Sequence, residues 1–465
     1  MARLLKSARM TLVLLMAAAL FPMGCGPQGP AGAASRQMAA GDFRDIIRGA
    51  KDKVFPAVIF IKTIRESYES GKKISEEIAG SGVIISDKGE ALSNWHVVDK
   101  AIEIRCLLSD GQAFDAKVLG KDKDIDLALL QLSTTASTKP LKYARLGDSR
   151  KLTEGDFVMA MGAPYGLSRS VSNGIISCTT RYLPELSEYS LWLQTDAHIS
   201  PGNSGGPLLN TEGEVIGINA RGTSRGGEMG FAIPSETIKD ILGQLREHGQ
   251  VNWSWTGLQL QPLKDFDRNM YFEGTQGVIV AETDQESPAR RAGVQPRDRI
   301  MKVNGKPVKA MWAEDLPALR RELGLLPKLK PIKVELLRGD KTVTVDVTPR
   351  EKGKVEGEEL DCPRWNMTVK AINQFDNPSL YFYRKTGVFI FGIKYPGNAS
   401  AAGLGQEDII TKIDDKEVTT LDEVKAIYKD AVANVAAKHR AVFVVLRNGL
   451  MKQIVMDFSR DYEKE

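Results

Sequence analysis

Short apolar segments, separated by clusters of Gly, Asp, Asn and Ser, recur along the chain between residues 42 and 232. In one of them, AIEIRCLL, the residues Ile102, Ile104, Cys106 and Leu108 alternate with other positions and share one face of a strand. This face predicts that Cys106 is a core thiol. Many short strands with turn residues between them predict an all-β sandwich or barrel. The other segments of this kind are AVIFIK, SGVIIS, IDLALLQL, FVMAMG, LWLQTD and VIGINA.

The spacing of apolar residues becomes helical in SETIKDILGQLREHG, which begins at Ser235. Ser235 is expected to cap the first turn, and Gly249 is expected to end the helix. This helix marks the end of the first domain. The residues of its apolar face are Ile238, Ile241, Leu242 and Leu245.

Residues 250 to 465 contain an internal repeat, in which matched residues keep one offset, as from Gly293 to Gly403. Each copy has the same order of expected elements: a β run, a short helix, a strand and a longer helix. Thr420 and Glu423 form a capping box in the second copy, and the charged stretch 350–361 is expected to be a linker. The matched residues are Ala292-Gly293 with Ala402-Gly403, Asp298 with Asp408, Ile300 with Ile410, Lys302 with Lys412, and Val308 with Val418.

The amino terminus has the layout of a secretory signal peptide. A basic head, MARLLKSAR, precedes the apolar run MTLVLLMAAALF, which is too short to span a bilayer core. Two cleavage sites compete. Gly24-Cys25 resembles a bacterial lipobox, with Cys25 as the lipidated residue, and Ala31-Gly32-Ala33 is a signal for ordinary cleavage. In both cases the mature chain is exported and begins with a flexible tether.

Length and composition narrow the class of protein. The 465 residues predict about three domains, and 63 Lys and Arg against 59 Asp and Glu give a net charge of +4. With 42% hydrophobic residues the chain is not disordered, collagenous or polytopic. The near-neutral balance argues against nucleic-acid binding, which needs a basic surface. Cys106, Cys178 and Cys362 lack metal-ligand spacing, so no metal is expected.

A glycine-rich segment, DAHISPGNSGGPLL, surrounds Ser204. A nucleophilic serine needs an exposed hydroxyl and nearby backbone N–H groups that point at a developing oxyanion. Glycine permits backbone conformations that turn such amides inward, so the amides of Gly202 and Ser204 are the candidate oxyanion hole. Taken alone, the string is more typical of an ordinary Gly/Ser turn than of a nucleophile.

His96, in the segment LSNWHVV, is the candidate general base among four histidines. His248 lies at a helix C-terminus and His439 in a polar stretch, and both positions are typical of surface residues. His198 is close to Ser204 in sequence, and neighbours in a tight loop seldom meet as base and nucleophile.

A carboxylate is also needed to orient the imidazole. Asp122, Asp124 and Asp126 precede or open the expected strand IDLALLQL. Asp126 adjoins the apolar run and would be the most buried, so it is the costliest of the three without a partner. Position alone favours Asp126 over Asp124 only modestly.

These segments resemble, in order along the chain, the blocks of the HtrA (DegP-like) serine proteases. The blocks are GSGVIIS, SNWHVV, DIDLALLQL, GDFVMAMGAPYGL, TDAHISPGNSGGPLLN and GFAIP. The resemblance covers essentially the whole chain. It implies a mainly β fold, with a trypsin-like double six-stranded β-barrel protease domain followed by two α+β PDZ domains. The family pattern falls on His96, Asp126 and Ser204, and so selects Asp126.

The resemblance implies acyl transfer without a metal or cofactor. Ile199 matches a family position that lines the primary specificity pocket, which implies preference for a small aliphatic side chain before the cleaved bond. Two residues depart from the family pattern: Trp95 stands where Ala is usual, and Ser93 stands where Thr is usual. Neither departure removes a catalytic group, but the indole must find room.

The two repeat copies resemble PDZ domains, which bind extended chain termini by adding a strand beside a groove. In the first copy Thr256, Gly257 and Leu258 resemble the loop that holds the terminal carboxylate. In the second copy Met367 stands where the family has Gly, which leaves peptide binding by this copy open. The alternative is that both copies are structural spacers.

The family assembles as trimers or larger oligomers through residues before the first strand. In this chain Phe43, Ile46 and Ile47 offer apolar contacts there. An N-terminal helix packed on its own domain is the competing interpretation.

The expected organisation is a signal peptide at 1–25, a tether at 26–41, the protease domain at 42–249, and PDZ domains at 250–352 and 353–465. The expected function is ATP-independent endopeptidase activity on unfolded or misfolded proteins of the bacterial periplasm, with peptide termini bound by the PDZ domains. The alternative is a peptide-binding chaperone or stress sensor whose protease rests inactive, which Trp95 keeps open. Lipidation of Cys25 would add a membrane tether.

Overall fold

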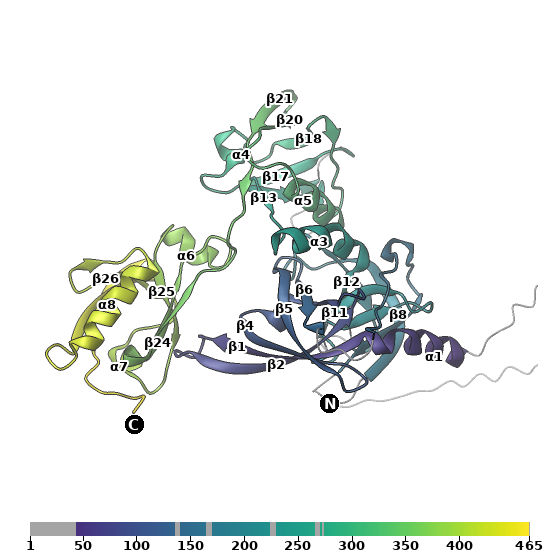
Figure 1. Cartoon of the computed structure of the whole chain (residues 1–465). Coiled ribbons are helices and arrows are strands. Elements are labelled where there is room, and N and C mark those ends of the chain that lie inside the picture. The colour runs from purple at the N-terminus through teal and green to yellow at the C-terminus, as the bar shows by residue number, and fades with distance from the viewer. Residues whose placement is uncertain are drawn as a thin grey trace, which may run out of the picture. The chain divides into compact units, whose positions relative to one another are not determined.

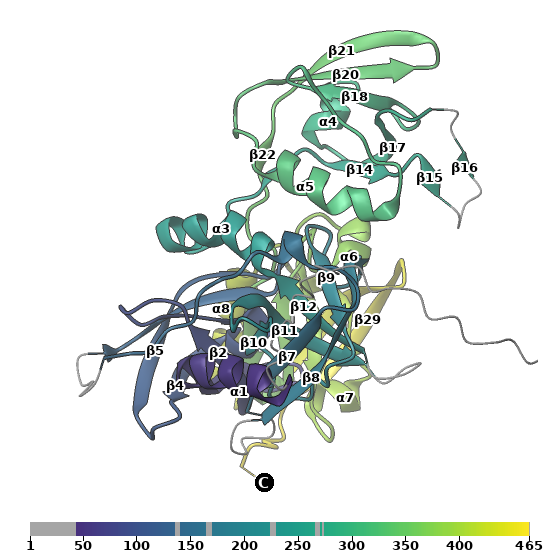
Figure 2. The ribbon, with the colours of Figure 1, turned by 90° about the vertical axis from the view of Figure 1, so that its right-hand side faces the viewer.

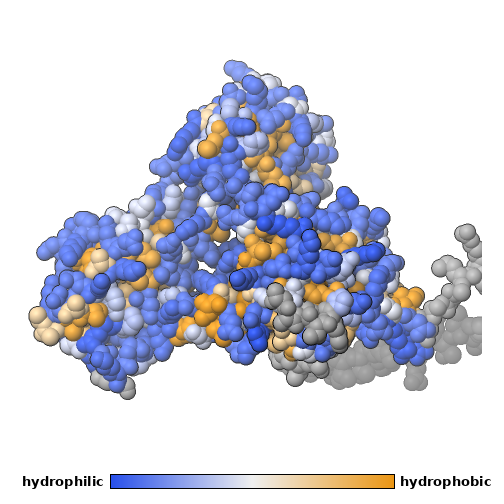
Figure 3. All heavy atoms as spheres, in the orientation of Figure 1, coloured by the Kyte–Doolittle hydropathy of each residue, from blue (hydrophilic) through white to orange (hydrophobic). Residues whose placement is uncertain are grey.

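The computed structural model describes residues 43–134, 140–163, 170–223, 229–265, 270–271 and 274–464. The expected signal peptide with Cys25, and the expected tether, lie outside these residues. Within the described part of the chain, every helix is too short or too polar to cross a membrane. On the face seen in Figure 3, hydrophilic residues predominate and apolar residues form separate patches.

The first six strands form a closed antiparallel barrel in the order β1-β2-β3-β6-β5-β4 (Figure 1). Its strands are β1 (Val58–Ser67), β2 (Ile74–Ile84), β3 (Glu90–Asn94), β4 (Ala101–Leu107), β5 (Ala113–Asp122) and β6 (Leu127–Leu132). Cys106 is buried inside the barrel, as its strand pattern predicts. Ile102 is instead 63% exposed, because the pairing of β1 with β4 skips this residue in a bulge.

The next six strands form a second closed barrel in the order β10-β11-β12-β9-β8-β7. They are β7 (Phe157–Gly162), β8 (Ser170–Tyr182), β9 (Leu191–Thr195), β10 (Pro207–Leu209), β11 (Val215–Thr223) and β12 (Met229–Pro234). Two closed six-stranded barrels are the architecture that the family resemblance implies. The α-helices that accompany the barrels in the described part of the chain are α1 (Phe43–Val54), α2 (Trp95–Val98) and α3 (Ser235–His248).

Helix α3 buries the apolar face expected from sequence, and Gly249 ends it in the left-handed region with φ 71°. The expected N-cap is wrong, because Pro234 occupies that position and Ser235 begins the helix. The buried Ser235 hydroxyl instead donates to the carbonyl oxygen of Gly147 at 2.9 Å and accepts from the Ser149 amide at 3.1 Å. It therefore ties the helix to the loop before β7.

The first repeat copy, called the first module below, is a sheet in the order β14-β17-β18-β20-β21, and helix α5 packs beside β14 (Figure 2). Its main elements are β14 (Leu258–Gln261), β17 (Val278–Thr283), α4 (Pro288–Arg291), β18 (Arg299–Val303), α5 (Leu316–Gly324), β20 (Ile332–Arg338) and β21 (Lys341–Val347). Short pairs of strands flank this sheet: β13 (Ser254–Trp255) with β22 (Arg350–Glu351), β15 (Lys264–Asp265) with β16 (Met270–Tyr271), and β19 (Lys306–Pro307) with β18.

The second repeat copy, called the second module, has the same order in β24-β25-β26-β28-β29, which confirms the duplication. Its elements are β24 (Met367–Ala371), α6 (Pro378–Tyr383), β25 (Val388–Ile393), α7 (Asn398–Ala402), β26 (Ile409–Ile413), β27 (Lys416–Glu417), α8 (Leu421–Ala433), β28 (Arg440–Arg447) and β29 (Leu450–Asp457). The capping box of Thr420 and Glu423 is present at α8.

The charged stretch 350–361 is not a plain linker, contrary to the sequence prediction. Its first residues form β22, and its last residues belong to strand β23 (Glu359–Cys362). β23 pairs in antiparallel register with β24 and extends the second sheet by one strand, with Leu360 opposite Val369. The first module has no strand in this place among the described residues, so the two repeat copies differ here.

Candidate active site

His96 and Asp126 lie side by side at the end of the first barrel. His96 is in the short helix α2, directly after β3, and Asp126 directly precedes β6, which pairs with β3. The two carboxylate oxygens of Asp126 lie 2.9 and 2.8 Å from Nδ1 of His96, and the backbone amide of His96 donates to Oδ1 at 3.1 Å. With its carboxylate on Nδ1, the neutral imidazole carries its proton there and leaves Nε2 as an acceptor.

Asp126 is held in an unusual backbone conformation. Its φ is 61°, in the left-handed region, which costs a residue with a side chain about 1–2 kcal/mol. Its carbonyl oxygen accepts from the amide of Trp95 and from the side-chain amide of Asn94, both at 3.1 Å. The residue is buried, with 5% of its surface exposed. The surroundings therefore fix both the backbone and the side chain of Asp126 against the imidazole.

The other two aspartates of this segment have different partners. Asp124 binds Lys352, with 2.6 Å between Nζ and Oδ2. Asp122 is buried and accepts from the amide of Ile125 at 2.8 Å and from the indole N–H of Trp253 at 2.9 Å. Burial, and next the carboxylate of Asp124, raise the pKa of Asp122 to about 7. Only Asp126 of the three contacts His96.

Ser204 lies where the two barrels meet. Its carbonyl oxygen accepts from the amide of Ser81, on β2 of the first barrel, at 2.8 Å. Its hydroxyl donates to the carbonyl oxygen of Ala220, on β11 of the second barrel, at 2.9 Å. The next residue, Gly205, has φ 87°, and a Cβ atom there would lie 2.1 Å from the carbonyl oxygen of Ser81. Glycine at this position therefore permits the close approach of the two barrels.

The backbone at 202–204 has the form expected of a donor loop. Gly202 has φ 99°, and the hydroxyl of Ser81 donates to its carbonyl oxygen at 2.6 Å. The amide of Asn203 is used within the turn, where it donates to the carbonyl oxygen of Ser200 at 2.9 Å. The amides of Gly202 and Ser204 have no acceptor among the described residues, so both are available to a ligand.

Ile199 is 8% exposed and packs in the core of the second barrel. It adjoins β11 and β12, because a Cβ atom on Gly222 would lie 2.3 Å from its carbonyl oxygen and one on Gly230 would lie 2.6 Å from its Cδ1. An apolar side chain therefore lies five residues before Ser204, between two glycines.

The two departures from the family pattern both find a place. The buried hydroxyl of Ser93 donates to the carbonyl oxygen of Ser81 at 2.8 Å. The indole of Trp95 lines a cavity of about 440 Å³ together with residues 249–253 and 351–356, and Nζ of Lys123 lies 5.3 Å from its ring centroid. The indole of Trp95 is therefore accommodated in a cavity formed with residues that follow the barrels in sequence.

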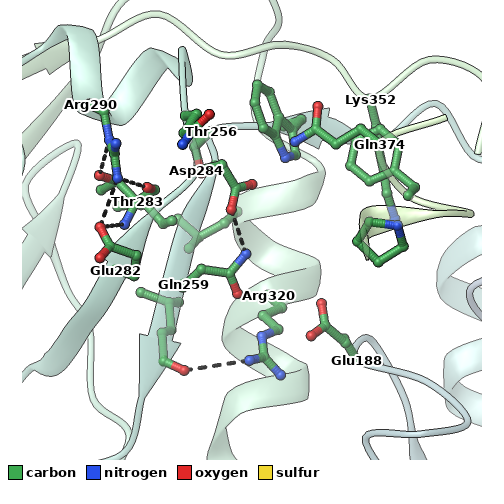
Figure 4. Close-up of a pocket in the computed structure, with 18 of the residues that line it drawn as sticks. Glu188, Thr256, Gln259, Glu282, Thr283, Asp284, Arg290, Arg320, Lys352 and Gln374 are labelled. Carbon is green, nitrogen blue, oxygen red and sulfur yellow. Dashed lines mark hydrogen bonds and ion pairs between the residues drawn. The ribbon is translucent and has the colours of Figure 1, made fainter. Parts of the chain in front are cut away.

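A second candidate site is the groove of the first module, a cavity of about 750 Å³ (Figure 4). Gly257 has φ 71°, and a Cβ atom there would lie 2.2 Å from Cβ of Ser287, so only glycine fits the loop without a shift. β14 pairs with β17 on one edge, and its other edge faces the groove. The lining includes Thr256 and Leu258 of the loop, Arg320 and Leu323 of α5, and Phe375 and Tyr381 of the second module.

Hydrogen bonds order the side chains around this groove. The guanidinium of Arg290 donates to Glu282 at 2.8 Å and to the carbonyl oxygen of Thr283, and the side-chain amide of Gln259 donates to the carboxylate of Asp284 at 2.8 Å (Figure 4). The groove is therefore lined by apolar side chains together with ordered polar groups, as is typical of a binding pocket.

The corresponding edge of the second module is occupied. β23 pairs with β24 on the edge that corresponds to the groove-facing edge of β14, and it also contacts α8. The amide of Arg364 donates to the hydroxyl of Tyr428 on α8 at 2.9 Å, and Cys362 is completely buried. Asn366, with φ 54°, takes the left-handed conformation that Gly257 takes in the first module. The stretch GEELDC has neither alternation nor a long apolar run, so sequence reasoning missed this strand.

Known proteins share both the barrels and the first module. The family of trypsin-like peptidase domains matches residues 80–218, and the family of PDZ domains matches residues 255–348. A probable periplasmic serine endoprotease DegP-like from Pseudomonas putida (strain W619) is 36% identical over 385 residues, which cover 80% of this chain and 77% of the relative. The protein of that name from Chlamydia muridarum (strain MoPn / Nigg) is 32% identical over 364 residues, with 77% and 71% covered.

Solved structures of HtrA-type proteases are similar to this chain as well. The HtrA-type protease AlgW with tripeptide superposes with a TM-score of 0.57 at 31% identity, covering 65% of this chain and 96% of that chain. The serine endoprotease from Yersinia pestis superposes with a TM-score of 0.51 at 30% identity, covering 65% and 97%.

Proposed function

This chain belongs to the DegP-like, or HtrA-type, family of serine endoproteases, and we propose that it cleaves unfolded or misfolded envelope proteins through Ser204, His96 and Asp126. It is a hydrolase of peptide bonds with a trypsin-like peptidase domain and PDZ domains. The observation that carries the residue assignment is the pair of contacts, 2.8 and 2.9 Å, between the buried Asp126 carboxylate and Nδ1 of His96.

The proposed reaction is acyl transfer. Nε2 of His96 takes the proton of the Ser204 hydroxyl while Oγ attacks the peptide carbonyl carbon, and the imidazolium then returns the proton to the leaving amine. Water, activated by the same imidazole, hydrolyses the acyl-enzyme. Asp126 keeps the proton on Nδ1 and stabilises the imidazolium, and its burial strengthens this interaction.

The amides of Gly202 and Ser204 are the proposed oxyanion hole. Two features support this role: the positive φ of Gly202, and the hydrogen bond from Ser81 that holds its carbonyl oxygen. Each such donor typically contributes about a hundredfold to a thousandfold in rate. Ile199 is the proposed wall of the primary specificity pocket, which favours a small aliphatic side chain before the cleaved bond.

We assign peptide-terminus binding to the first PDZ domain alone. Thr256, Gly257 and Leu258 would hold the terminal carboxylate, and the groove-facing edge of β14 would pair with the peptide. In the second PDZ domain β23 pairs with the edge of β24 that a peptide would need. The second module would therefore serve as a structural element.

The proposed setting is the bacterial periplasm, because the relatives are named periplasmic and the sequence begins with an expected signal peptide. The proposed domain limits are 42–249 for the protease domain and 250–352 and 353–465 for the PDZ domains. A trimer or larger oligomer through Phe43, Ile46 and Ile47, and a lipid tether at Cys25, are further proposals. The exposure of Ile46, at 43%, supports the first.

One observation favours a second candidate function, a peptide-binding chaperone or stress sensor with a resting protease. The Ser204 hydroxyl donates to Ala220 and not to His96. A resting enzyme of this kind would become active only when a ligand redirects the hydroxyl.

The test compares the full chain with its Ser204→Ala variant. We expect a fluorophosphonate to label the wild type only, and the wild type alone to degrade a permanently unfolded protein. Equal labelling or equal degradation would overturn the assignment of Ser204. Labelling that requires an added peptide ligand would favour the resting sensor.

A further inference from the structure

Three consecutive residues ahead of the proposed catalytic carboxylate each bind a side chain from the part of the chain that follows the barrels. These residues are Asp122, Lys123 and Asp124, and their respective partners are Trp253, Glu356 and Lys352. Trp253 directly precedes β13, and the other two residues follow β22, so they flank residues 255–348, which match the PDZ family. The segment that ends at Asp126 is therefore bound by residues on both sides of this match.

The first contact fixes the start of the segment. The indole N–H of Trp253 donates to Oδ2 of Asp122 at 2.9 Å, and both groups are buried. Trp253 also stacks on Tyr189, with ring centroids 4.4 Å apart. Because Oδ1 of Asp122 accepts from the amide of Ile125, the indole and the turn share one carboxylate.

The second contact buries a lysine. The side chain of Lys352 is 10% exposed, and its Nζ lies 2.6 Å from Oδ2 of Asp124. The same Nζ lies 5.0 Å from the ring centroid of Tyr189 and 5.1 Å from that of Phe375. Burial by itself lowers the pKa of this ammonium, but Tyr189 and Asp124 outweigh it, and the net shift is upward. Lys352 therefore stays charged and stays attached to Asp124.

The third contact reaches the neighbour of the histidine. Nζ of Lys123 lies 2.7 Å from Glu356 and 3.6 Å from Asp376, and it also lies over the ring of Trp95. Trp95 directly precedes His96. The ammonium of Lys123 therefore bridges acidic side chains after the first PDZ domain to the residue beside the proposed base.

Backbone hydrogen bonds carry these contacts to Asp126. Its amide donates to the carbonyl oxygen of Lys123 at 3.2 Å, and its carbonyl oxygen accepts from the amide of Trp95 at 3.1 Å. Asp126 needs this support because its φ of 61° is unfavourable for a residue with a side chain. A shift of Lys123 or Trp95 would therefore move the carboxylate relative to the imidazole.

We propose that Lys352 and Glu356 are positioning residues, which hold the segment Asp122–Asp126 so that the carboxylate of Asp126 orients His96. The inference rests on the proposed function of Asp126 and His96. It makes the rate of acyl transfer depend on residues 352–356, between β22 and β23, which reach Asp126 through Asp124, Lys123 and Trp95. Lys352 also lines the groove of the first module. A misplacement of about 1 Å in a catalytic group is enough to lower a rate by up to about a hundredfold.

The test uses full-length variants and a short chromogenic peptide amide with Val before the cleaved bond. Such a substrate has no free carboxyl terminus, so the first PDZ domain does not take part. For Lys352→Met and for Glu356→Gln we expect kcat to fall about tenfold with KM changed less than about twofold. Lys352→Arg keeps the charge and should restore most of the activity.

The matched control is Lys354→Met. Lys354 lies in the same stretch, but its side chain is 78% exposed and binds Glu358, which is exposed as well. This variant should keep the wild-type kcat.

A second readout is the acid limb of the pH profile of kcat/KM. A displaced carboxylate stabilises the imidazolium less, so the limb should move to lower pH in Lys352→Met and stay in place in the control.

The outcomes separate this inference from the proposed function. Suppose that the wild type is active and that Lys352→Met and Glu356→Gln both have the wild-type kcat and pH profile. The positioning role is then wrong, while the assignment of Ser204, His96 and Asp126 is unaffected. Equal losses in Lys352→Met and Lys354→Met would also overturn it. If the wild type itself shows no labelling that depends on Ser204, the proposed function fails first.

Discussion

The hydroxyl of Ser204 donates its hydrogen bond to the carbonyl oxygen of Ala220, at 2.9 Å. Ala220 is the residue that the pairing of β11 with β12 skips, between Asn219 and Arg221. A bulge leaves a backbone carbonyl without a partner in the sheet, and here the serine hydroxyl satisfies it. In the proposed mechanism this proton passes to His96, so a bound substrate would have to release it from the second barrel.

The contact between His96 and Asp126 gives the first prediction. Asp126→Asn keeps the size of the side chain but places an amide against Nδ1, which favours the wrong tautomer of the imidazole. We expect kcat for a peptide amide to fall about 10⁴-fold with little change in KM. Asp115→Asn, at an exposed ion pair in the same barrel, is the control and should be unchanged. Equal activity of both variants would contradict the role of Asp126.

The close approach of the barrels gives the second prediction. In Gly205→Ala the new Cβ would lie 2.1 Å from the carbonyl oxygen of Ser81, at φ 87°. We expect a loss of at least about 2 kcal/mol in unfolding free energy, measured by urea denaturation, together with loss of fluorophosphonate labelling. Gly243→Ala, inside α3 with open space around it, should instead stabilise by about 0.5–1 kcal/mol. A neutral Gly205→Ala would contradict the packing.

Asp122 gives a prediction about pH. Burial raises its pKa in the folded protein to about 7, whereas an unfolded aspartate titrates near 3.9. Between these values the folded state binds a proton that the unfolded state has lost, so this group's contribution to stability is greatest below pH 4 and falls as the pH rises to about 7. The slope reaches at most about 1.4 kcal/mol per pH unit.

The measurement for Asp122 is the difference in unfolding free energy between the wild type and Asp122→Asn, from pH 5 to pH 8. We expect the wild type to lose stability relative to the variant as the pH rises to about 7, and the difference to stay constant above that value. A constant difference across the whole range would show that the carboxylate is ionised throughout.

The occupied edge of β24 gives a prediction about stoichiometry. Titration calorimetry of the Ser204→Ala chain with a peptide ending in an apolar residue and a free carboxylate should give one site per chain. Gly257→Val should abolish it, because a side chain there meets Ser287. Met367→Gly restores the family glycine in the second module, yet it should add no second site while β23 occupies the edge. Two sites per chain would contradict the closed groove.

Ile199 gives a prediction about specificity. Peptides with Val or Ala before the cleaved bond should have a higher kcat/KM than peptides with Lys or Asp, because burial of a charge against an apolar wall is unfavourable. Ile199→Ala should enlarge the pocket and improve cleavage after Leu or Phe relative to Val, by about tenfold or less. The reverse ranking of Val and Lys in the wild type would contradict the assignment.

The amino-acid sequence determined the fold class and the repeat. Short alternating segments with turn residues between them specify strands locally, and a fixed offset between Gly293 and Gly403 identifies a duplicated module without any tertiary information. His96 and Ser204 are also identifiable as candidates from the sequence. The chain has only four histidines that could act as the general base, and Ser204 lies in a glycine-rich segment suited to a nucleophile. All of these signals depend on spacing along the chain.

The tertiary structure alone decided which groups meet. Asp122, Asp124 and Asp126 look alike in sequence, yet one contacts His96 while the other two contact Trp253 and Lys352. The stretch before residue 362 has no strand pattern, because β23 is ordered by the edge of β24 and by α8 rather than by its own residues. Contacts between separate elements leave no periodic trace in the sequence, since they depend on how the folded elements pack on one another.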